Sequence, residues 1–471
     1  MILIYLICAI ALGATQFVIR NRQMTHIVAM GTILLQWVLT IYATLHRDET
    51  DLFFFKYDGL GILMLWALAI ISSVTMLHST RYIPTPIQYD LNRMTSQYYG
   101  AMQILMMALS AAYLSSHIAM TWIFIEVTTL SASALIFYRR DKGSVEATWK
   151  YVFACSISLV LVYVGILLIT IAMQQNAEEG LSFATLEKYA STMDEFWLKM
   201  SMIFILVGYS AKMSLFPMFT AGIDAKDKAP TPAAGLLSSV LMNAGFVAFY
   251  RFYKVMQLAA ACIWARYVVL GIAIVSLFVA AVYLIRVHNV KRLFAYSSVE
   301  HMAVAMLGLA AGGIGTIYCI LHVIIHSFVK SSIFLHIAHI YRVYGTKQLS
   351  NIGRYIRYTG VGTTIVFLAT ISITAMPPSG LFFTELMIFK SMIDMHWWIC
   401  LAVVLILLTV IVWAISRDMF SFLFQKPEEP IEIEPKSVNM PYGEMIGQLL
   451  LLFIAIWLGI YTPSFVSDLI L

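Results

Sequence analysis

A few titratable residues lie in the middle of long apolar segments, where a charge is costly. Glu126 lies in HIAMTWIFIEVTTLSASALIFY, Lys212 in FILVGYSAKMSLFPMF and Glu385 in ITAMPPSGLFFTELMIFK. Because a charge at bilayer depth costs several kcal/mol, each residue is a candidate for moving protons or other ions. The alternative interpretations are a neutral glutamate that only joins helices and a lysine whose side chain reaches back to the membrane surface.

The segment LHVIIHSFVKSSIFLHIAHIY adds a row of titratable groups. His322, His326 and Lys330 are spaced i, i+4 and i+8, so they share one face of a helix. A row of this kind inside an apolar helix is typical of a proton relay. His336 and His339 lie nearer the end of the segment, where interfacial histidines are an equal interpretation.

Three further charged residues are weaker candidates. Glu146 and Lys150 are spaced i, i+4 in SVEATWKYVF, which favours either a functional pair or an ordinary interfacial ion pair. Lys390 ends its apolar segment and is expected at the membrane interface.

The elements that carry these residues are expected to be membrane-spanning helices. Of the 471 residues, 61% are hydrophobic and 12% are charged. A typical soluble domain carries about 25% charged residues, so a cytosolic enzyme, a disordered chain and a nucleic-acid binder are excluded. A spanning helix needs about 20 mainly apolar residues, and fourteen segments qualify, which predicts an all-α polytopic membrane protein. Their expected limits are residues 1–19, 25–45, 57–78, 97–115, 117–138, 145–173, 196–219, 231–256, 260–285, 293–312, 314–341, 359–394, 397–421 and 443–465.

The distribution of Lys and Arg predicts the orientation. With the N-terminus outside, the inward loops hold nineteen of these residues and the outward loops seven. Positive charge favours the inner side, so both termini are expected outside. Residues 174–195 are expected to form an acidic outer loop with a short surface helix, and the Pro- and Glu-rich residues 425–442 an inner-face linker.

Proline residues predict two broken helices. Pro217 interrupts the seventh helix, and Pro377 with Pro378 interrupts the twelfth. Breaks five helices apart indicate two inverted five-helix repeats, helices four to eight and nine to thirteen, in which Glu300 takes the position of Glu126. The expected divisions are residues 1–95 (helices one to three), 96–257 and 258–421 (the repeats), and 422–471 (the linker and helix fourteen).

The sequence contains no motif for a bound cofactor or metal. None of the five cysteines belongs to a Cys-x-x-Cys pair, and no glycine-rich phosphate loop precedes a helix. We therefore expect no redox cofactor, nucleotide or metal in this chain.

Several motifs resemble a known superfamily. In order, they are IEVTTLSASALI, VEATWKY, GYSAKMSLFP, KRLFAYSSVEHM, HSFVKSSIFLHIAHIY and MPPSGLFFTELMIF. Over about residues 55–420 the chain resembles the proton-translocating antiporter-like subunits of respiratory complex I, the Mrp antiporters and the group 4 membrane-bound hydrogenases. YSSVEHM, which contains Glu300 and His301, and the Asn243 of LMNAGF are most similar to the hydrogenase-4 component F branch.

The resemblance implies roles for individual residues. Glu126 and Lys212 would form a pair in which the carboxylate tunes the proton affinity of the lysine, and Glu385 would be the terminal exchange residue. The row His322, His326 and Lys330 would be the relay. Two departures stand out: Asn243 replaces the usual lysine of helix eight, so the axial path is either interrupted or bridged by water. Phe219 and Lys226 stand at positions that the family gives to histidine.

The resemblance also implies a function and partners. The chain would be a proton- or sodium-translocating membrane subunit of a respiratory or hydrogenase-type redox complex, with electron transfer in partner subunits driving the ions. Partners would be other membrane subunits and a peripheral iron–sulfur hydrogenase or dehydrogenase arm, in the lipid bilayer of the cytoplasmic membrane. The alternatives are a non-redox cation/proton antiporter or inorganic-carbon transporter subunit with a soluble partner, and a structural remnant that does not conduct.

Overall fold

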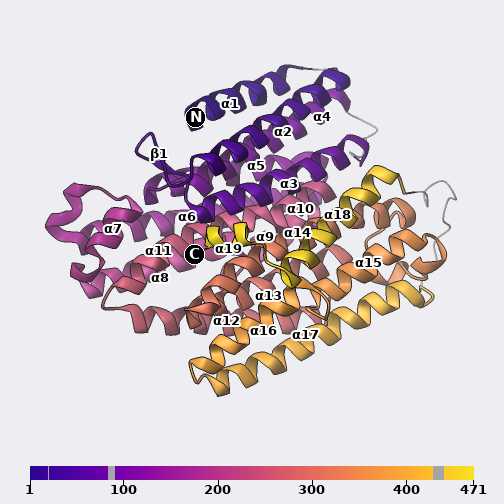
Figure 1. Ribbon diagram of the computed structural model, residues 1–471. Coiled ribbons are helices and arrows are strands. Elements are labelled where there is room, and N and C mark those ends of the chain that lie inside the picture. The colour runs from indigo at the N-terminus through magenta and orange to yellow at the C-terminus, as the bar shows by residue number, and fades with distance from the viewer. Residues whose placement is uncertain (20, 83–90, 428–439, 471) are drawn as a thin grey trace.

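The chain folds into a bundle of long helices that run side by side (Figure 1). The computed structural model describes residues 1–19, 21–82, 91–427 and 440–470. Within these ranges, 11 helices are long and apolar enough to cross a membrane. Each of the fourteen expected segments is helical. The prediction of an all-α polytopic membrane protein is therefore confirmed.

The first half of the chain contains eight helices and one small hairpin. The short helix expected in the outer loop is present as α7. The elements are α1 (Ile2–Val18), α2 (Arg22–Leu45), β1 (Thr50–Asp51), β2 (Phe55–Lys56), α3 (Gly59–Tyr82), α4 (Leu91–Leu114), α5 (Ile118–Ile136), α6 (Lys142–Met173), α7 (Phe183–Tyr189) and α8 (Glu195–Met213).

The second half contains the remaining helices of the described chain. The expected linker at 425–442 lies mostly outside the described residues. The elements are α9 (Thr220–Lys228), α10 (Thr231–Ser238), α11 (Val240–Leu258), α12 (Cys262–Leu284), α13 (Val290–Ala311), α14 (Ile314–Tyr344), α15 (Gly360–Ile373), α16 (Gly380–Asp394), α17 (Trp398–Phe424), α18 (Tyr442–Ile460) and α19 (Ser464–Ile470).

Both predicted helix breaks are present. Pro217 lies between the end of α8 and the start of α9, and Pro377 and Pro378 lie between α15 and α16. Proline has no backbone N–H to continue a helix, which explains both positions. At the first break Ser214 adopts a left-handed conformation with φ 55°.

The structure adds detail to two sequence expectations. The segment 231–256 was expected as one helix, but it divides at Ser239 into α10 and α11, although no proline lies at that point. The Ser239 hydroxyl donates to the carbonyl of Gly235 at 2.7 Å, a local bond of the kind that competes with regular helix. The expected division at residues 95–96 falls inside α4, so a first repeat that includes the whole of α4 starts at Leu91.

Side-chain caps fix where several functional helices begin. Asp194, Asn289 and Ser379 precede α8, α13 and α16, and each side-chain oxygen accepts a hydrogen bond from a backbone N–H in the first turn. Such caps satisfy donors that a helix start leaves free, and each is worth about 1 kcal/mol. Fixed starts set the positions of the titratable side chains further along each helix.

α8 and α11 lie close together because Gly245 of α11, which has no side chain, faces Lys212 of α8. A Cβ on Gly245 of α11 would lie 2.7 Å from the Cβ of Lys212, closer than packed carbon atoms allow. α13 and α14 are enclosed by other helices, whereas α17 exposes apolar side chains such as Ile399 and Ile406. The core of the bundle is therefore the place where the titratable groups lie.

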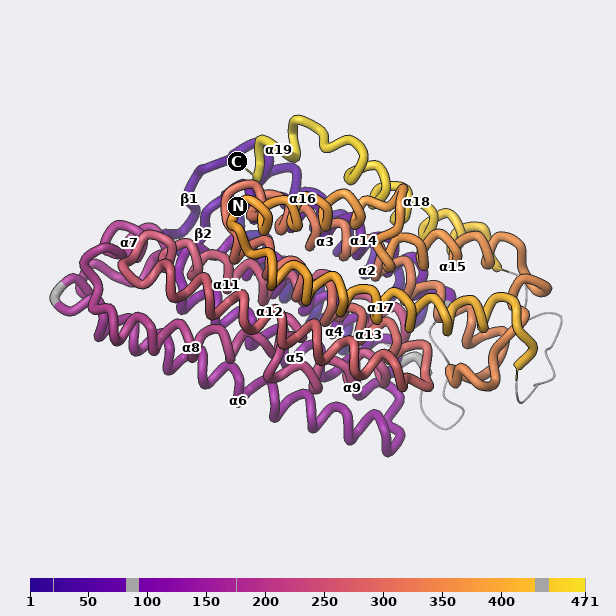
Figure 2. The backbone as a smooth tube through the Cα atoms, turned by 90° about the horizontal axis from the view of Figure 1, so that it is seen from below, coloured from indigo at the N-terminus to yellow at the C-terminus, as the bar shows by residue number. Residues whose placement is uncertain are grey.

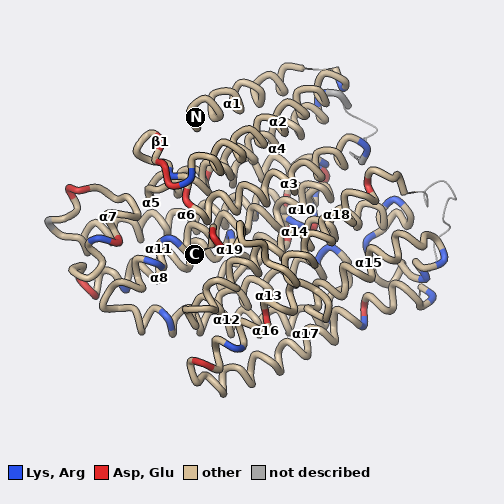
Figure 3. Tube along the Cα trace, in the orientation of Figure 1, with Lys and Arg blue, Asp and Glu red and all other residues tan. Residues whose placement is uncertain are grey.

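Charged residues concentrate toward the two ends of the helices, and only a few lie in the middle (Figure 3). Both chain termini lie on the side of the bundle that carries the β1–β2 hairpin and α7 (Figure 1, Figure 2). We call this the α7 end and the other side the opposite end. This arrangement agrees with the expectation that both termini face the same compartment.

An ion pair between a buried arginine and a half-buried aspartate joins helices at the α7 end. Arg251 of α11 donates to Asp58 at 2.7 and 3.0 Å and to the carbonyls of Tyr113 and Ser115. We expect Arg251→Met to lower the free energy of unfolding by about 2–4 kcal/mol, because several acceptors lose their donor. Thermal melting in detergent would measure the loss. Arg47→Met, at a more exposed pair, is the control, and an equal change in both variants would contradict the prediction.

Candidate ion-translocation site

Lys212 is held inside the bundle by hydroxyl groups. Its Nζ donates to Thr129 Oγ1 at 2.7 Å, Tyr151 OH at 3.2 Å and Thr128 Oγ1 at 3.4 Å. Both threonine hydroxyls donate to the carbonyl of Ile125, so they present lone pairs to the lysine. The side chain is 4% exposed, and it therefore does not reach back to the membrane surface.

Glu126 lies on α5 beside this group but does not touch Lys212. Its Oε1 accepts a hydrogen bond from Ser156 Oγ at 3.2 Å, and its Oε2 has no hydrogen-bond partner among the described residues. The carboxylate is close enough to interact electrostatically with Lys212. The expected pair therefore interacts at a distance, through a site lined by hydroxyl groups.

Lys226 is a functional candidate that the sequence reasoning did not select. It lies on α9, just after the break, and its Nζ donates to Ser214 Oγ at 3.1 Å and approaches Met242 Sδ at 3.2 Å. A small internal cavity separates it from Lys212. Gly222 permits this packing, since a Cβ there would lie 2.8 Å from Ser214 Oγ. The signal available in the sequence was a lysine at a position where the family has histidine.

Lys330 is fully buried in the middle of α14. Its Nζ donates to the carbonyl of Phe294 at 2.6 Å and, in a short contact, to Ser297 Oγ. Glu300 lies one turn along α13 from Ser297 and is close enough to Lys330 and Glu385 to interact with both. Glu300 therefore bridges the lysine and the expected exchange residue.

Three histidines meet between α13, α14 and α16. His301 Nδ1 lies 3.3 Å from His322 Nε2 and 3.7 Å from Glu385 Oε1. The ring of His326 lies 5.2 Å, centroid to centroid, from that of His301. We call His301, His322, His326 and Glu385 the histidine cluster. The predicted row on α14 is thus buried and continues to Glu385 through His301, which the sequence analysis named only as part of the motif YSSVEHM.

Serine and asparagine side chains lie between the two groups of titratable residues. Asn243 Oδ1 accepts from Ser327 Oγ at 3.0 Å, and Ser331 Oγ donates to Ser239 Oγ at 3.0 Å. Within the described chain, Asn243 Nδ2 has no partner. The break at Ser239 therefore turns its hydroxyl toward α14, one residue from Lys330.

Polar contacts continue along α14 toward the opposite end. His336 contacts Gln448 Oε1 at 2.8 Å and Tyr355 OH at 3.0 Å, and His339 contacts the same Tyr355 hydroxyl at 2.7 Å. Both histidines are buried inside the bundle. Gln448 lies in the expected span 443–465, but its residue type alone did not single it out.

Glu444 is a buried acid that the sequence did not mark as a candidate. It lies in the first turn of α18, accepts from Arg342 at 3.0 and 3.3 Å, and approaches His78 at 3.7 Å. Only the packing of α3, α14 and α18 reveals its burial.

Two expected charges lie at the surface instead. Glu146 and Lys150 form an exposed ion pair at 2.6 Å, which favours the interfacial interpretation. Lys390 is also exposed, as expected.

An ion network at the opposite end joins α9, α13 and the loop after α14. Arg292 donates to Asp224 at 2.5 Å and approaches Asp227 at 3.5 Å, and Lys347 donates to Asp227. Burial lowers the pKa of Lys347, and the neighbouring Asp227 opposes that shift. The network anchors α9, which carries Lys226.

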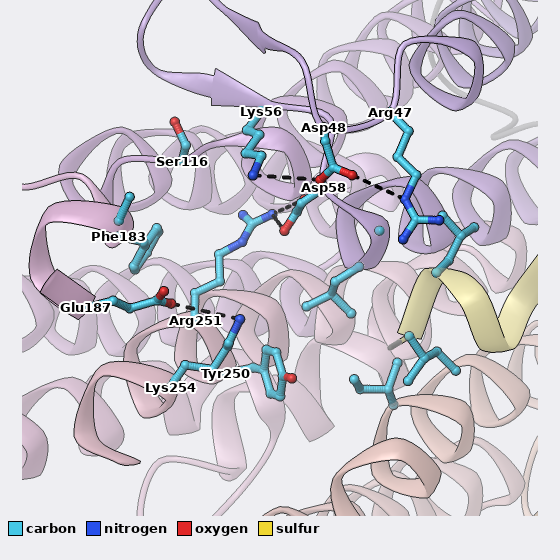
Figure 4. Close-up of a pocket in the computed structure, with 16 residues that line it drawn as sticks. Arg47, Asp48, Lys56, Asp58, Ser116, Phe183, Glu187, Tyr250, Arg251 and Lys254 are labelled. Carbon is cyan, nitrogen blue, oxygen red and sulfur yellow. Dashed lines mark hydrogen bonds and ion pairs between the residues drawn. The ribbon is translucent and has the colours of Figure 1, made fainter. Parts of the chain in front are cut away.

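A charged pocket opens at the α7 end (Figure 4). Arg251 reaches Asp58 across it, and Lys254 approaches Glu187 at 3.9 Å. Ile320 also lines the pocket and lies two residues before His322 on α14. The pocket therefore extends from the surface to α14.

A helical bundle with broken helices around a buried row of titratable side chains defines a class, the polytopic ion-translocating membrane proteins. The chain belongs to the family described as NADH:quinone oxidoreductase/Mrp antiporter, TM, whose model matches residues 115–411.

Individual relatives agree with this membership. The chain is 29% identical over 443 residues to a hydrogenase-4 component F homolog of Methylacidiphilum infernorum, covering 92% of this chain and 90% of that one. It is 26% identical over 353 residues to Na(+)/H(+) antiporter subunit A1 of Staphylococcus saprophyticus, covering 72% of this chain and 42% of the relative. A chain of an archaeal membrane-bound sulfane sulfur reductase has the same fold, with a TM-score of 0.83, 20% identity and coverage of 100% and 95%.

Proposed function

We propose that this chain is the proton- or sodium-translocating membrane subunit of a redox complex. One observation carries the proposal: buried titratable groups continue from Lys212 through Lys226 and Lys330 to Glu385, with hydroxyl groups between them. A row of charges inside an apolar bundle is expensive and is typical of ion pathways.

We propose Lys226 as the bridge between the two halves of this row. Asn243 cannot hold a proton, so it cannot serve as the helix-eight amine that the resemblance leads one to expect. Lys226 faces Lys212 across a cavity and is close enough to act electrostatically on His326 and Lys330. A proton that moves between Lys212 and the row on α14 can then bind to the amine of Lys226 on its way.

The direction and the setting form part of the same proposal. The charged pocket at the α7 end is the outer entrance, and the polar contacts from His336 to Glu444 lead to the inner face. The chain lies in the cytoplasmic membrane with both termini outside, among other membrane subunits and a peripheral iron–sulfur arm. One charge moved against 100 mV requires about 2.3 kcal/mol, which electron transfer in a partner would supply.

The relative from Staphylococcus favours a second candidate function. It is named as a Na(+)/H(+) antiporter subunit, so a cation/proton exchange without a redox arm is the alternative. The proposed path is the same in both cases. Purification of the native complex distinguishes them, because iron–sulfur subunits that purify with the chain support the first function and their absence supports the second.

Transport by the reconstituted chain tests the proposed path. In proteoliposomes with an imposed membrane potential, we expect Lys212→Ala to reduce proton or sodium flux by at least about tenfold, because the row loses a group that holds the ion. Internal pH and sodium dyes measure the flux. Lys390→Ala, an exposed lysine, should keep the wild-type rate. Equal flux in the wild type and Lys212→Ala would favour a scaffold that does not conduct.

A further inference from the structure

The hydrogen bonds around His301 define which ring nitrogen is free. Its Nε2 lies 2.9 Å from the carbonyl oxygen of Ile373. A carbonyl oxygen only accepts, so Nε2 carries the hydrogen and donates. In the neutral ring, Nδ1 therefore presents a lone pair, and it points toward His322 and Glu385.

The same reasoning applies to His322. Its Nδ1 lies 2.8 Å from Thr384 Oγ1, and the Thr384 hydroxyl donates to the carbonyl of Leu381 at 2.9 Å. The hydroxyl has one hydrogen, so its oxygen accepts from His322 Nδ1. The Nε2 of His322 is then the free nitrogen, and it faces His301.

With both rings neutral and Glu385 ionised, three acceptor atoms meet at one buried point. The lone pairs of His301 Nδ1 and His322 Nε2 face each other at 3.3 Å, and Glu385 Oε1, which has no hydrogen-bond partner in the described chain, lies 3.7 Å from the first. All three atoms lie within 4.8 Å of one another. Buried acceptors without a donor are costly, so this point favours a cation.

The spacing and the donor set fit a transition-metal ion. Two zinc–nitrogen bonds of about 2.0–2.1 Å at the tetrahedral angle put the nitrogens about 3.3 Å apart. Metal-binding histidines usually donate their other ring N–H to an oxygen, as His301 and His322 do to Ile373 and Thr384. Imidazole with one carboxylate selects Zn²⁺, Co²⁺, Ni²⁺ or Cu²⁺ over Na⁺, Mg²⁺ or Ca²⁺.

We propose that His301, His322 and Glu385 form a binding site for a divalent transition-metal ion such as Zn²⁺. His326, whose two ring nitrogens have no partner among the described residues, is the candidate for the fourth ligand. The ligands come from α13, α14 and α16, so no local sequence motif could reveal the site. A bound metal ion occupies the place of a relayed proton and therefore inhibits transport. This inhibition rests on the proposed function. The binding of the metal ion does not depend on it.

Metal binding to the full-length protein in detergent tests the site without any transport. Co²⁺ is the probe, since a site with imidazole ligands gives visible d–d absorption, and the purification tag must contain no histidine. We expect one Co²⁺ per chain in the wild type and at least about tenfold weaker binding in His301→Gln and His322→Gln. His336→Gln is the matched control, since it removes another buried histidine of α14.

Two results would overturn the site. One is a wild-type protein that binds no Co²⁺, and the other is binding in His301→Gln and His322→Gln equal to that of the wild type. If these variants fold poorly, X-ray absorption of the Zn²⁺-loaded wild type replaces them, with two imidazole ligands expected and fewer contradicting the proposal. Zinc inhibition of flux is measured separately, so a protein that binds metal but does not transport would refute only the proposed function.

Discussion

Replacing Lys330 with methionine is expected to reduce ion transport by about a factor of 10² or more, the largest loss of any single substitution in the chain. Methionine fills a similar volume without an ammonium group. Lys330 is fully buried, and its Nζ contacts the carbonyl of Phe294 and the hydroxyl of Ser297. A proton that reaches this point along α14 would find no group to hold it.

The reason for so large an effect is the position of Lys330 between acids and histidines. Glu300 interacts with Lys330 and with Glu385, and His326 lies one turn before Lys330 on the same face of α14. Removal of the ammonium leaves Glu300 buried without its nearest positive charge. An uncompensated buried carboxylate is costly, so the substitution also disturbs the neighbouring acid.

Flux in proteoliposomes measures the effect, with Lys390→Met as the control because Lys390 is exposed. A second variant, Lys330→Arg, keeps the charge but holds its proton permanently, so we expect it to fold well and to conduct as poorly as Lys330→Met. Flux near the wild-type rate in Lys330→Arg would show that the charge alone, and not proton exchange, is what the pathway needs.

Much of the fold followed from local patterns. The spans followed from runs of apolar residues, and the breaks at Pro217 and Pro378 followed from the missing backbone donor. The row on α14 followed from spacing of four residues, which any helix places on one face. These features depend on neighbours in the sequence, and so the sequence alone was sufficient for them.

The rest depended on helices that are distant in the sequence. His301 belongs to the histidine cluster only because α13 packs beside α14 and α16. Glu444 is buried only because α18 packs against Arg342. The break at Ser239 contains no proline, so nothing in the local pattern marked it. Spacing shows which side chains share a helix face, but it does not show which face another helix covers.

Lys226→Met is expected to reduce transport by about tenfold or more, although the sequence marked this residue only as a departure from a family pattern. Lys226 donates to Ser214 beside the cavity that it shares with Lys212, and Met242 Sδ, next in the chain to Asn243, lies 3.2 Å from its Nζ. Without it, no amine among the described residues lies between Lys212 and the relay on α14. The loss is measured as ion flux and as proton movement driven by an imposed pH gradient.

A second substitution distinguishes a bridging role from a structural one. Asn243 contacts Ser327, which lies one turn before Lys330, so Lys226→Met with Asn243→Lys supplies an amine at the family's usual position. If Lys226 carries protons between the halves, the double variant regains most of the lost flux, while Lys226→Met with Asn243→Ala regains none. If Lys226 only supports the turn at Ser214, the two double variants are equally impaired, because neither restores the hydrogen bond to that hydroxyl. Rescue by Asn243→Lys but not by Asn243→Ala would therefore show that Lys226 carries the protons that a lysine at position 243 would otherwise carry. Equal loss in both double variants would show that the role of Lys226 is structural.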